Sequence, residues 1–295
     1  MMVTTDANTA RQAGIYDEKL GELSDFDHPH NLTLLHQRGL LQAMELTPRA
    51  RVLEVGGHRS GALPYLERHH QVVGHGIDVS PVWVDAHNRL AAARDSATTW
   101  TVGTAEALPF GDASFDGLVA FDVYEHVSDM LAALREAARV LRPGGRLVCH
   151  LPVADIGWSF DGWQRSRDPA DFAARQASVG HYHERLPTRL QMRTRLESCG
   201  FDVLEVRSFN VWLQPLHDHR LMPWLGKLRH RGGARDAAGT PTHSGELPRQ
   251  TASRYQKFYA AVALPLAQAL TSVDAIGARV GIGGSASFVA GRSGR

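Results

Sequence analysis

The sequence predicts an α/β protein built on a doubly wound, mostly parallel sheet. Short apolar runs alternate with stretches of helical periodicity, the pattern of successive strand–helix units. Residues 51–55 are the first such run, and a glycine-rich turn and an apolar helical pattern follow at once. A later strand at 146–150 follows a helix at 129–141 whose apolar positions recur every three or four residues. A chain of 295 residues, 43% of them hydrophobic, is long enough for one such domain with an elaboration.

The first strand and its turn form the most informative stretch, Arg51-Val-Leu-Glu-Val-Gly-Gly-His-Arg-Ser-Gly61. Glycines allow positive φ angles and let a ligand approach the backbone, and a helix start presents free N–H groups. Glu54 lies inside an apolar strand, where burial of its carboxylate costs energy unless it has a partner. The next strand, 72–78, ends in Asp78, at the spacing expected of a carboxylate that binds ribose. The turn alone does not separate a phosphate site from other cofactor sites.

The remaining elements follow in order. A helix at 81–94 begins with Ser80 as N-cap and Pro81 in its first turn. Ser128 caps the helix at 129–141, and Pro143-Gly-Gly145 ends it. We also expect short helices at 16–21 and after Asp168-Pro169, helices at 32–46, 188–199 and 255–273, and strands at 98–102, 115–121 and 201–207.

In their order and spacing these segments resemble the class I S-adenosylmethionine-dependent methyltransferases, especially the small-molecule branch that includes ubiquinone-pathway enzymes. Besides the first two strands, four stretches carry the resemblance: Gly103-Thr-Ala-Glu-Ala-Leu-Pro-Phe110, Ser114-Phe-Asp-Gly-Leu-Val119, Glu125-His-Val127 and Leu141-Arg-Pro-Gly-Gly-Arg-Leu-Val148. It covers residues 50–150 well and 180–208 loosely. It implies a Rossmann-like sheet with an antiparallel seventh strand, which residues 285–291 fit, and S-adenosyl-L-methionine as cofactor.

The resemblance also implies a cofactor site, from which this chain departs at two positions. His58 stands where the middle glycine of the turn is usual, and Thr104 where an acid usually reaches the adenine amino group. The stretch after the fourth strand is expected beneath the methionine part of the cofactor, and Leu108-Pro-Phe110 against the adenine, although plain loop packing explains that apolar triplet as well. The implied cofactor residues are Glu54, Gly56, Gly57, His58, Gly61, Asp78, Val79, Thr104, Ala105, Glu106, Phe121, Asp122 and His126.

Fewer residues are candidates for catalysis than for cofactor binding. Imidazole titrates near neutrality, so we expect a general base, if one is used, to be His150 or His183, followed by His181 and Asp155. A structural role for His181, fixing the next helix start, is the alternative. Candidate acceptor residues are Tyr16, His30, Tyr124, Trp158, Trp163, Tyr182 and Trp212; for those near the N-terminus, surface and helix-cap roles compete. No two-histidine spacing supports a metal site, so none is expected.

The domain limits follow from these segments. We expect a tail and lid helices at 1–48, the cofactor-binding core at 49–208, a substrate-capping insert at 209–284, and a final strand with its tail at 285–295. The insert is far longer than an ordinary connection. Its tryptophans and leucines need to cover something: the acceptor pocket, a second subunit or a membrane surface. We expect the acceptor pocket, with a homodimer as an open alternative and no stable membrane association.

The composition of the chain argues against nucleic acid and membrane as partners. A net charge of +1 gives no electrostatic argument for nucleic acid, and no apolar run reaches the roughly 18 residues of a spanning helix. Residues 1–12 are polar, so we expect no signal peptide, and two isolated cysteines suit a reducing, cytoplasmic setting.

The predicted function is methyl transfer from S-adenosylmethionine to an oxygen, nitrogen or carbon of a small molecule, with a secondary-metabolite or sugar hydroxyl preferred by analogy. Two alternatives stay open: a nicotinamide-dependent oxidoreductase, which would share the turn and Asp78, and a non-catalytic protein with a relic cofactor pocket, which His58 and Thr104 suggest.

Overall fold

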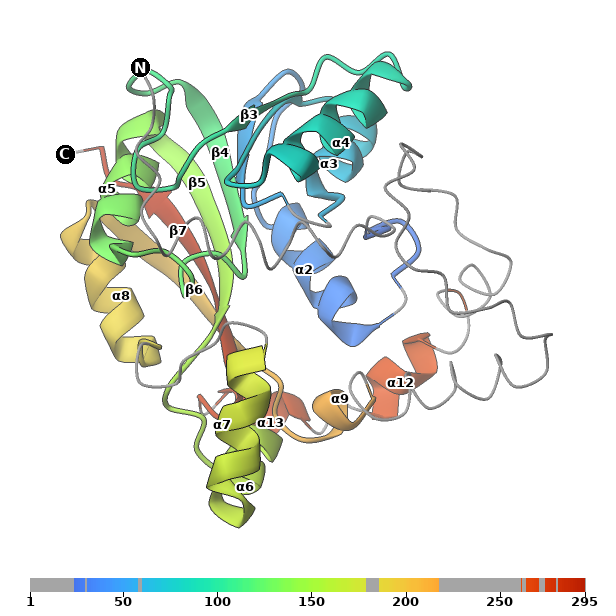
Figure 1. Cartoon of the computed structure of the whole chain (residues 1–295), viewed down its shortest axis with the longest axis vertical. Coiled ribbons are helices and arrows are strands. Elements are labelled where there is room, and N and C mark those ends of the chain that lie inside the picture. Colours follow the sequence, from blue (N-terminus) through green and yellow to red (C-terminus); the bar gives the residue numbers. More distant parts are fainter. Residues whose placement is uncertain are drawn as a thin grey trace.

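The structure is a computed structural model that describes residues 24–29, 31–57, 60–178, 186–217, 261, 264–270, 274–279 and 281–294. Its elements, shown in Figure 1, are α2 (Leu32–Gln42), β1 (Arg51–Val55), α3 (Ala62–His70), β2 (Val73–Asp78), α4 (Pro81–Ala92), β3 (Thr99–Val102), β4 (Phe115–Phe121), α5 (Met130–Val140), β5 (Leu141–Pro152), α6 (Phe160–Arg167), α7 (Pro169–Ser178), α8 (Arg189–Ser198), β6 (Phe201–Phe209), α9 (Leu213–Leu216), α12 (Leu264–Leu270), α13 (Asp274–Arg279) and β7 (Ser285–Arg292).

The strands form one seven-stranded sheet in the order β3-β2-β1-β4-β5-β7-β6. Neighbours from β3 to β5 pair in parallel, whereas β7 is antiparallel to both β5 and β6. The predicted Rossmann-like sheet with an antiparallel seventh strand is therefore confirmed. The chain order reverses between β1 and β4, and in open α/β sheets ligands bind at the carboxyl ends of the strands beside such a reversal.

Helices cover both faces of the sheet. In Figure 1, α2, α3 and α4 lie on one face and α5 and α8 on the other. Alternate residues of a strand point to opposite faces, so β1 contributes to two cores. Val52 packs with residues of α2 and α3, and Leu53 with residues of α5 and α8. The sheet is thus buried on both faces and forms a rigid base for loops at its carboxyl edge.

One helix signal acts as predicted, and two boundaries differ. Ser80 caps α4, its hydroxyl accepting the Trp83 N–H at 3.1 Å. Thr188, the first residue of the helix predicted at 188–199, is the cap of α8 and forms a complete capping box. The cap of α5 is Asp129, not Ser128, because its carboxylate accepts the Ala132 N–H at 3.0 Å. β5 begins already at Leu141, so Pro143-Gly-Gly145 lies within that strand, where a register shift against β4 absorbs it.

Two predicted helices are described only in part or not at all. The predicted helix at 16–21 lies outside the described residues. Of the helix predicted at 255–273, the structure describes residue 261 and α12. Across the described ranges, no helix has both the length and the apolar character that crossing a membrane requires.

Candidate cofactor and acceptor site

The glycine-rich turn joins β1 to α3 at the carboxyl edge of the sheet. Gly56 has a φ of +76°, and a Cβ there would lie 2.4 Å from a methyl group of Val123. A Cβ on Gly57 would lie 2.0 Å from the ring of Trp100. Gly56 therefore serves the tight turn, whereas Gly57 is required by packing. The ring of His87 stacks on Trp100 at 4.1 Å, and its Nε2 donates a hydrogen bond to the Gly57 carbonyl. These two contacts hold the turn in place.

Glu54 is the buried carboxylate of β1, with 2% of its surface exposed. Its Oε2 accepts the backbone N–H of Leu63 at 3.2 Å, in the first turn of α3. Burial raises the pKa of Glu54 to about 7; the nearby charge of Asp78 adds to this, and hydrogen bonds from Ser60 and Leu63 oppose it. Glu54 therefore fastens the start of α3 to β1.

This raised pKa predicts a pH dependence of stability. The folded protein keeps the Glu54 proton up to about pH 7, whereas the unfolded chain releases it near 4.5, so the unfolded state binds fewer protons between these values. The free energy of unfolding should fall by about 3 kcal/mol as the pH rises through this window. Glu54→Gln keeps the acceptor for Leu63 and should lose this slope. Urea titrations from about pH 4 to 8 measure it.

The matched control is Asp85→Asn, which removes the same charge from an exposed ion pair with Arg89. Its stability curve should run parallel to that of the wild type. A Glu54→Gln curve that also ran parallel would show that Glu54 is not the titrating group.

Asp78 ends β2 next to this turn. It is 7% exposed, its Oδ1 accepts the Ser80 N–H at 2.8 Å, and its carbonyl accepts the N–H of Gly103 at 3.0 Å. Val79, beside it, is half-buried. A fixed carboxylate at the end of β2, beside Gly56 and Gly57 of the turn, has the chemistry to accept hydrogen bonds from the hydroxyls of a ribose. Asp78 and the glycine-rich turn therefore fit a cofactor that contains a nucleoside.

The N-terminal segment packs on this turn. A Cβ on Gly61 would lie 2.0 Å from the carbonyl oxygen of Ser24, so glycine is needed for this approach. Phe26 is 2% exposed, with its ring 6.0 Å from Tyr65 and 6.4 Å from Phe121. The described part of the predicted lid region therefore lies against the site. Tyr16 and His30 lie outside the described residues.

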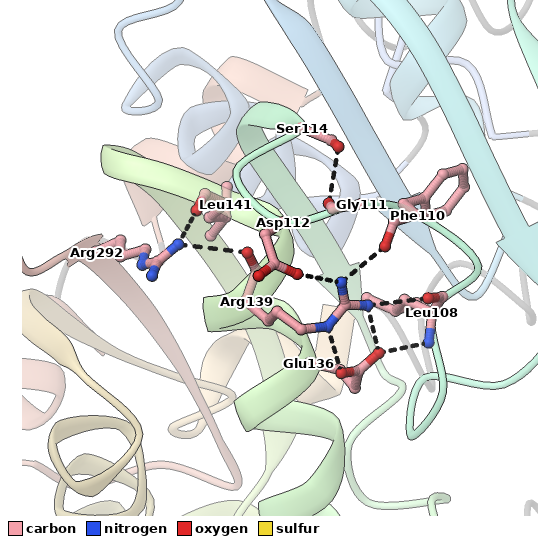
Figure 2. A network of polar contacts seen from close by, with 9 residues as sticks. All are labelled: Leu108, Phe110, Gly111, Asp112, Ser114, Glu136, Arg139, Leu141 and Arg292. Carbon is pink, nitrogen blue, oxygen red and sulfur yellow. Dashed lines mark hydrogen bonds and ion pairs between the residues drawn. The ribbon is translucent and has the colours of Figure 1, made fainter.

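The loop between β3 and β4 is held by Arg139 of α5 (Figure 2). Its guanidinium forms two bonds of 2.7 Å with Glu136 and one of 2.8 Å with Asp112, and donates to the carbonyls of Phe110 and Leu108. Glu136 in turn accepts the Leu108 N–H at 2.8 Å. This network fixes the segment that the resemblance places against the adenine.

The other predicted residues of this loop have local roles. Ala105 is buried in the core, and Thr104 pairs with Ala107 in a single bridge. The side chain of Glu106 accepts the Ser128 N–H at 2.9 Å, so it ties the loop to the start of α5.

A cavity of about 750 Å³ opens at the carboxyl ends of β4 and β5. Asp122 and His150 lie in its wall, and α6 and α7 close it from the other side. Asp122 has a φ of +55°, a strained value for a residue with a side chain, and its Oδ1 lies 3.8 Å from His150 Nε2. The lining residues are Thr33, Asp122, His150, Pro152, Val153, Ile156, Phe160, Asp161, Gln164, Asp171, Phe172, Arg175, Gln176, Leu186, Asn210, Gly284 and Ser285.

Comparison with known proteins agrees with this geometry. The model of a methyltransferase domain matches residues 53–149. The ubiquinone/menaquinone biosynthesis C-methyltransferase UbiE of Dinoroseobacter shibae is 30% identical in an alignment 187 positions long, which covers 58% of this chain and 75% of that protein. The chain belongs to the class I S-adenosylmethionine-dependent methyltransferases.

Other relatives of this chain are less similar to it, or the chain spans only part of their length. An O-methyltransferase of Pyrenophora dematioidea is 27% identical, with 72% of this chain and 77% of that protein covered. The chain spans only about half the length of the first C-methyltransferase relatives, 51% of the one from Caulobacter. A Haemonchus contortus phosphoethanolamine N-methyltransferase 2, solved in complex with S-adenosyl-L-methionine, shares the fold at a TM-score of 0.59 and 16% identity, covering 96% of this chain and 57% of that one.

The structure brings only some of the predicted acceptor and catalytic residues of this chain to the cavity. His150 lines it. Asp155 instead accepts the backbone and guanidinium N–H groups of Arg189, and so anchors the start of α8. His181, Tyr182, His183 and His58 lie outside the described residues.

The aromatic candidates lie elsewhere than expected. Tyr124 is 2% exposed and belongs to the core under α5 and α8. Trp158 is 86% exposed, and Trp163 and Trp212 are partly exposed neighbours with ring centroids 6.3 Å apart; none of the three lines the cavity. Phe160 and Gln164, four residues apart on one face of α6, line it instead. His126 is partly buried, 3.9 Å from Glu125, and no group of three metal-ligating side chains occurs in the described ranges.

Sequence reasoning missed several residues that the fold places here. His36 of α2 and Ser287 of β7 adjoin His150, and Gln164, Arg175 and Asn210 line the cavity. The usable signal was helical spacing: Thr33, which lines the cavity, and His36 are three residues apart and share one face of α2.

Proposed function

We propose that this protein transfers a methyl group from S-adenosylmethionine to a hydroxyl of a small, partly apolar molecule held in the 750 Å³ cavity. The observation that carries the proposal is the position of this cavity: it begins at Asp122 and His150, where β4 and β5 end beside the glycine-rich turn and Asp78. An acceptor there lies next to the edge at which the family binds its cofactor.

The lining supports an acceptor with both apolar and polar parts. Val153, Ile156, Phe160, Phe172 and Leu186 offer apolar surface. The same lining contains the hydrogen-bonding side chains of Asp122, Gln164 and Asn210. A mixed lining of this kind orients a ligand by a few polar contacts while its apolar part is buried.

A hydroxyl acceptor is favoured by His150. Burial lowers the pKa of this imidazole, with the charge of Asp122 opposing the shift, so the ring is neutral at physiological pH and can accept a proton. The bound cofactor would supply the activated methyl group. The protein's contribution is to hold the cofactor's ribose at Asp78, align the acceptor in the cavity, and accept its proton.

The strand order argues against the oxidoreductase alternative. Dinucleotide-binding sheets run in the order 3-2-1-4-5-6, whereas here an antiparallel β7 is inserted between β5 and β6.

Calorimetry and turnover test the proposal together. We expect the protein to bind S-adenosylmethionine and its demethylated product, but not NAD. With a labelled methyl donor, a panel of hydroxyl, amine and carbon acceptors of similar size should yield labelled product chiefly from hydroxyls. Tight cofactor binding without turnover on any acceptor would favour the non-catalytic alternative, and preferential labelling of amines would contradict the hydroxyl assignment.

A further inference from the structure

Three polar side chains from distant parts of the chain form a continuous hydrogen-bonded row beside the acceptor cavity. Ser287 Oγ lies 2.8 Å from His150 Nδ1 and 2.8 Å from His36 Nε2. The row ends at the cavity with the other nitrogen of His150, 3.8 Å from Asp122 Oδ1. It ends at α2 with His36, which keeps part of its surface exposed.

The fold fixes this row. His150 and Ser287 face each other directly across the antiparallel β5–β7 ladder, so their side chains share one face of the sheet. His36 reaches that face from α2. Phe209 of β6 stacks on the His36 ring at 4.1 Å and meets the His150 ring edge-on at 5.8 Å. Ser287 itself has no exposed surface.

We propose that His150, Ser287 and His36 form a proton path from the acceptor cavity to solvent, with His150 as the catalytic base and the other two as positioning and relay residues. This inference rests on the proposed methyl transfer. The acceptor O–H bond breaks as its proton bonds to His150 Nε2. His150 Nδ1–H then gives its proton to Ser287 Oγ, Ser287 gives its own to His36 Nε2, and His36 Nδ1–H releases one to water. The net change is one proton moved from acceptor to solvent.

The charges around the row suit transfer rather than storage of a proton. Burial, the neighbouring His150 and the Arg207 guanidinium lower the pKa of His36 to about 3. Arg207 is itself paired with Glu205 by bonds of 2.7 and 2.8 Å. Asp122, at the cavity end, stabilises a transient charge on His150. Burial lowers the pKa of both rings, so neither is held as an imidazolium at neutral pH. After the transfer each ring carries its one proton on the opposite nitrogen, and both rings return to the starting tautomer before the next turnover.

The ring nitrogens test the path without any activity. A hydroxyl has one hydrogen, so Ser287 can donate to only one ring. The relay therefore requires that His150 Nδ1 is protonated, which leaves His150 Nε2 free to accept, and that His36 Nε2 is bare. In ¹⁵N spectra of the full chain near neutral pH, we expect a protonated His150 Nδ1 and a bare His36 Nε2; two protonated nitrogens, or the reverse pattern, would overturn the path.

Substitutions test its use in turnover. Ser287→Ala and His36→Phe, which keeps the ring stack, should each lower kcat about tenfold or more at neutral pH, with KM and cofactor affinity changed less than about twofold. Ser287→Thr, which keeps the hydroxyl, should restore the kcat lost in Ser287→Ala. The matched control is Ser208→Ala, a buried serine of the same sheet bonded to Arg189 instead.

The outcomes are distinct. Ser287→Ala turnover within about twofold of wild type, or no lower than that of Ser208→Ala, would overturn the relay. If no acceptor is methylated, the proposed function fails, while the ¹⁵N spectra still decide whether the proton path exists.

Discussion

Replacing Asp78 with alanine is expected to weaken S-adenosylmethionine binding by well over tenfold. A buried carboxylate that accepts two ribose hydroxyls contributes about 1.5–3 kcal/mol for each bond, and about 1.4 kcal/mol corresponds to a factor of ten in affinity. The effect should be large because Asp78 is fixed before binding, with one oxygen already held by the Ser80 N–H. Calorimetry on the purified protein measures it.

Two further variants separate binding from folding. Asp78→Asn keeps an acceptor for Ser80 and should fold as well as the wild type, while still losing the charge that strengthens the ribose contacts. Asp85→Ala removes an exposed carboxylate from the neighbouring helix and should leave affinity unchanged. A folded Asp78→Ala protein that binds the cofactor normally would refute the assignment of this residue.

The second large effect is expected at Asp274, which holds the two ends of the insert together. Its carboxylate accepts the backbone N–H groups of Trp212 at 3.2 Å, Leu213 at 3.2 Å and Gln214 at 3.0 Å, and it is 9% exposed. Asp274→Ala leaves these donors without their acceptor. We expect a loss of about 3 kcal/mol or more in the free energy of unfolding. Thermal and urea unfolding measure this loss.

The same substitution should weaken acceptor binding more than cofactor binding. Asn210, which lines the cavity, accepts the Gly284 N–H at 3.0 Å and is bonded to Gln214 and Ser285. Loosening of Trp212–Gln214 therefore disturbs the cavity wall, whereas Asp78 is held by Ser80 and has no bond to residues 212–214. Asp168→Ala, which removes one bond at an exposed helix start, is the control and should cost about 1 kcal/mol or less. Equal losses in the two variants would contradict the role of Asp274.

This prediction also bears on the insert as a whole. We propose that residues 209–284 cap the acceptor pocket, because both described ends of this range, at Asn210 and Gly284, border the cavity. If Asp274→Ala raised the acceptor KM without changing cofactor affinity, that proposal would gain direct support.

The sequence by itself determined the features that depend on neighbouring residues. A strand that ends in glycines, a second that ends in Asp78 and a Ser80-Pro81 helix start are all local patterns, and the structure contains each of them. Their order along the chain also identified the family, and with it the antiparallel seventh strand. Cap choice was already less secure: Ser128 and Asp129 are adjacent and chemically equivalent as caps, and only backbone geometry selects Asp129.

Tertiary structure alone decided the acceptor side of the site. His150 and Ser287 are 137 residues apart, and His36 and Ser287 are 251 apart, so no spacing rule links them. They meet because β7 enters the sheet between β5 and β6, which sets the register of Ser287 opposite His150. The tryptophans predicted to contact the acceptor do not line the cavity, because their orientation also depends on tertiary packing. Apolar area predicts that a side chain is buried against something, but the helix orientation that turns Phe160 and Gln164 to the cavity and leaves Trp158 exposed is fixed by packing between elements.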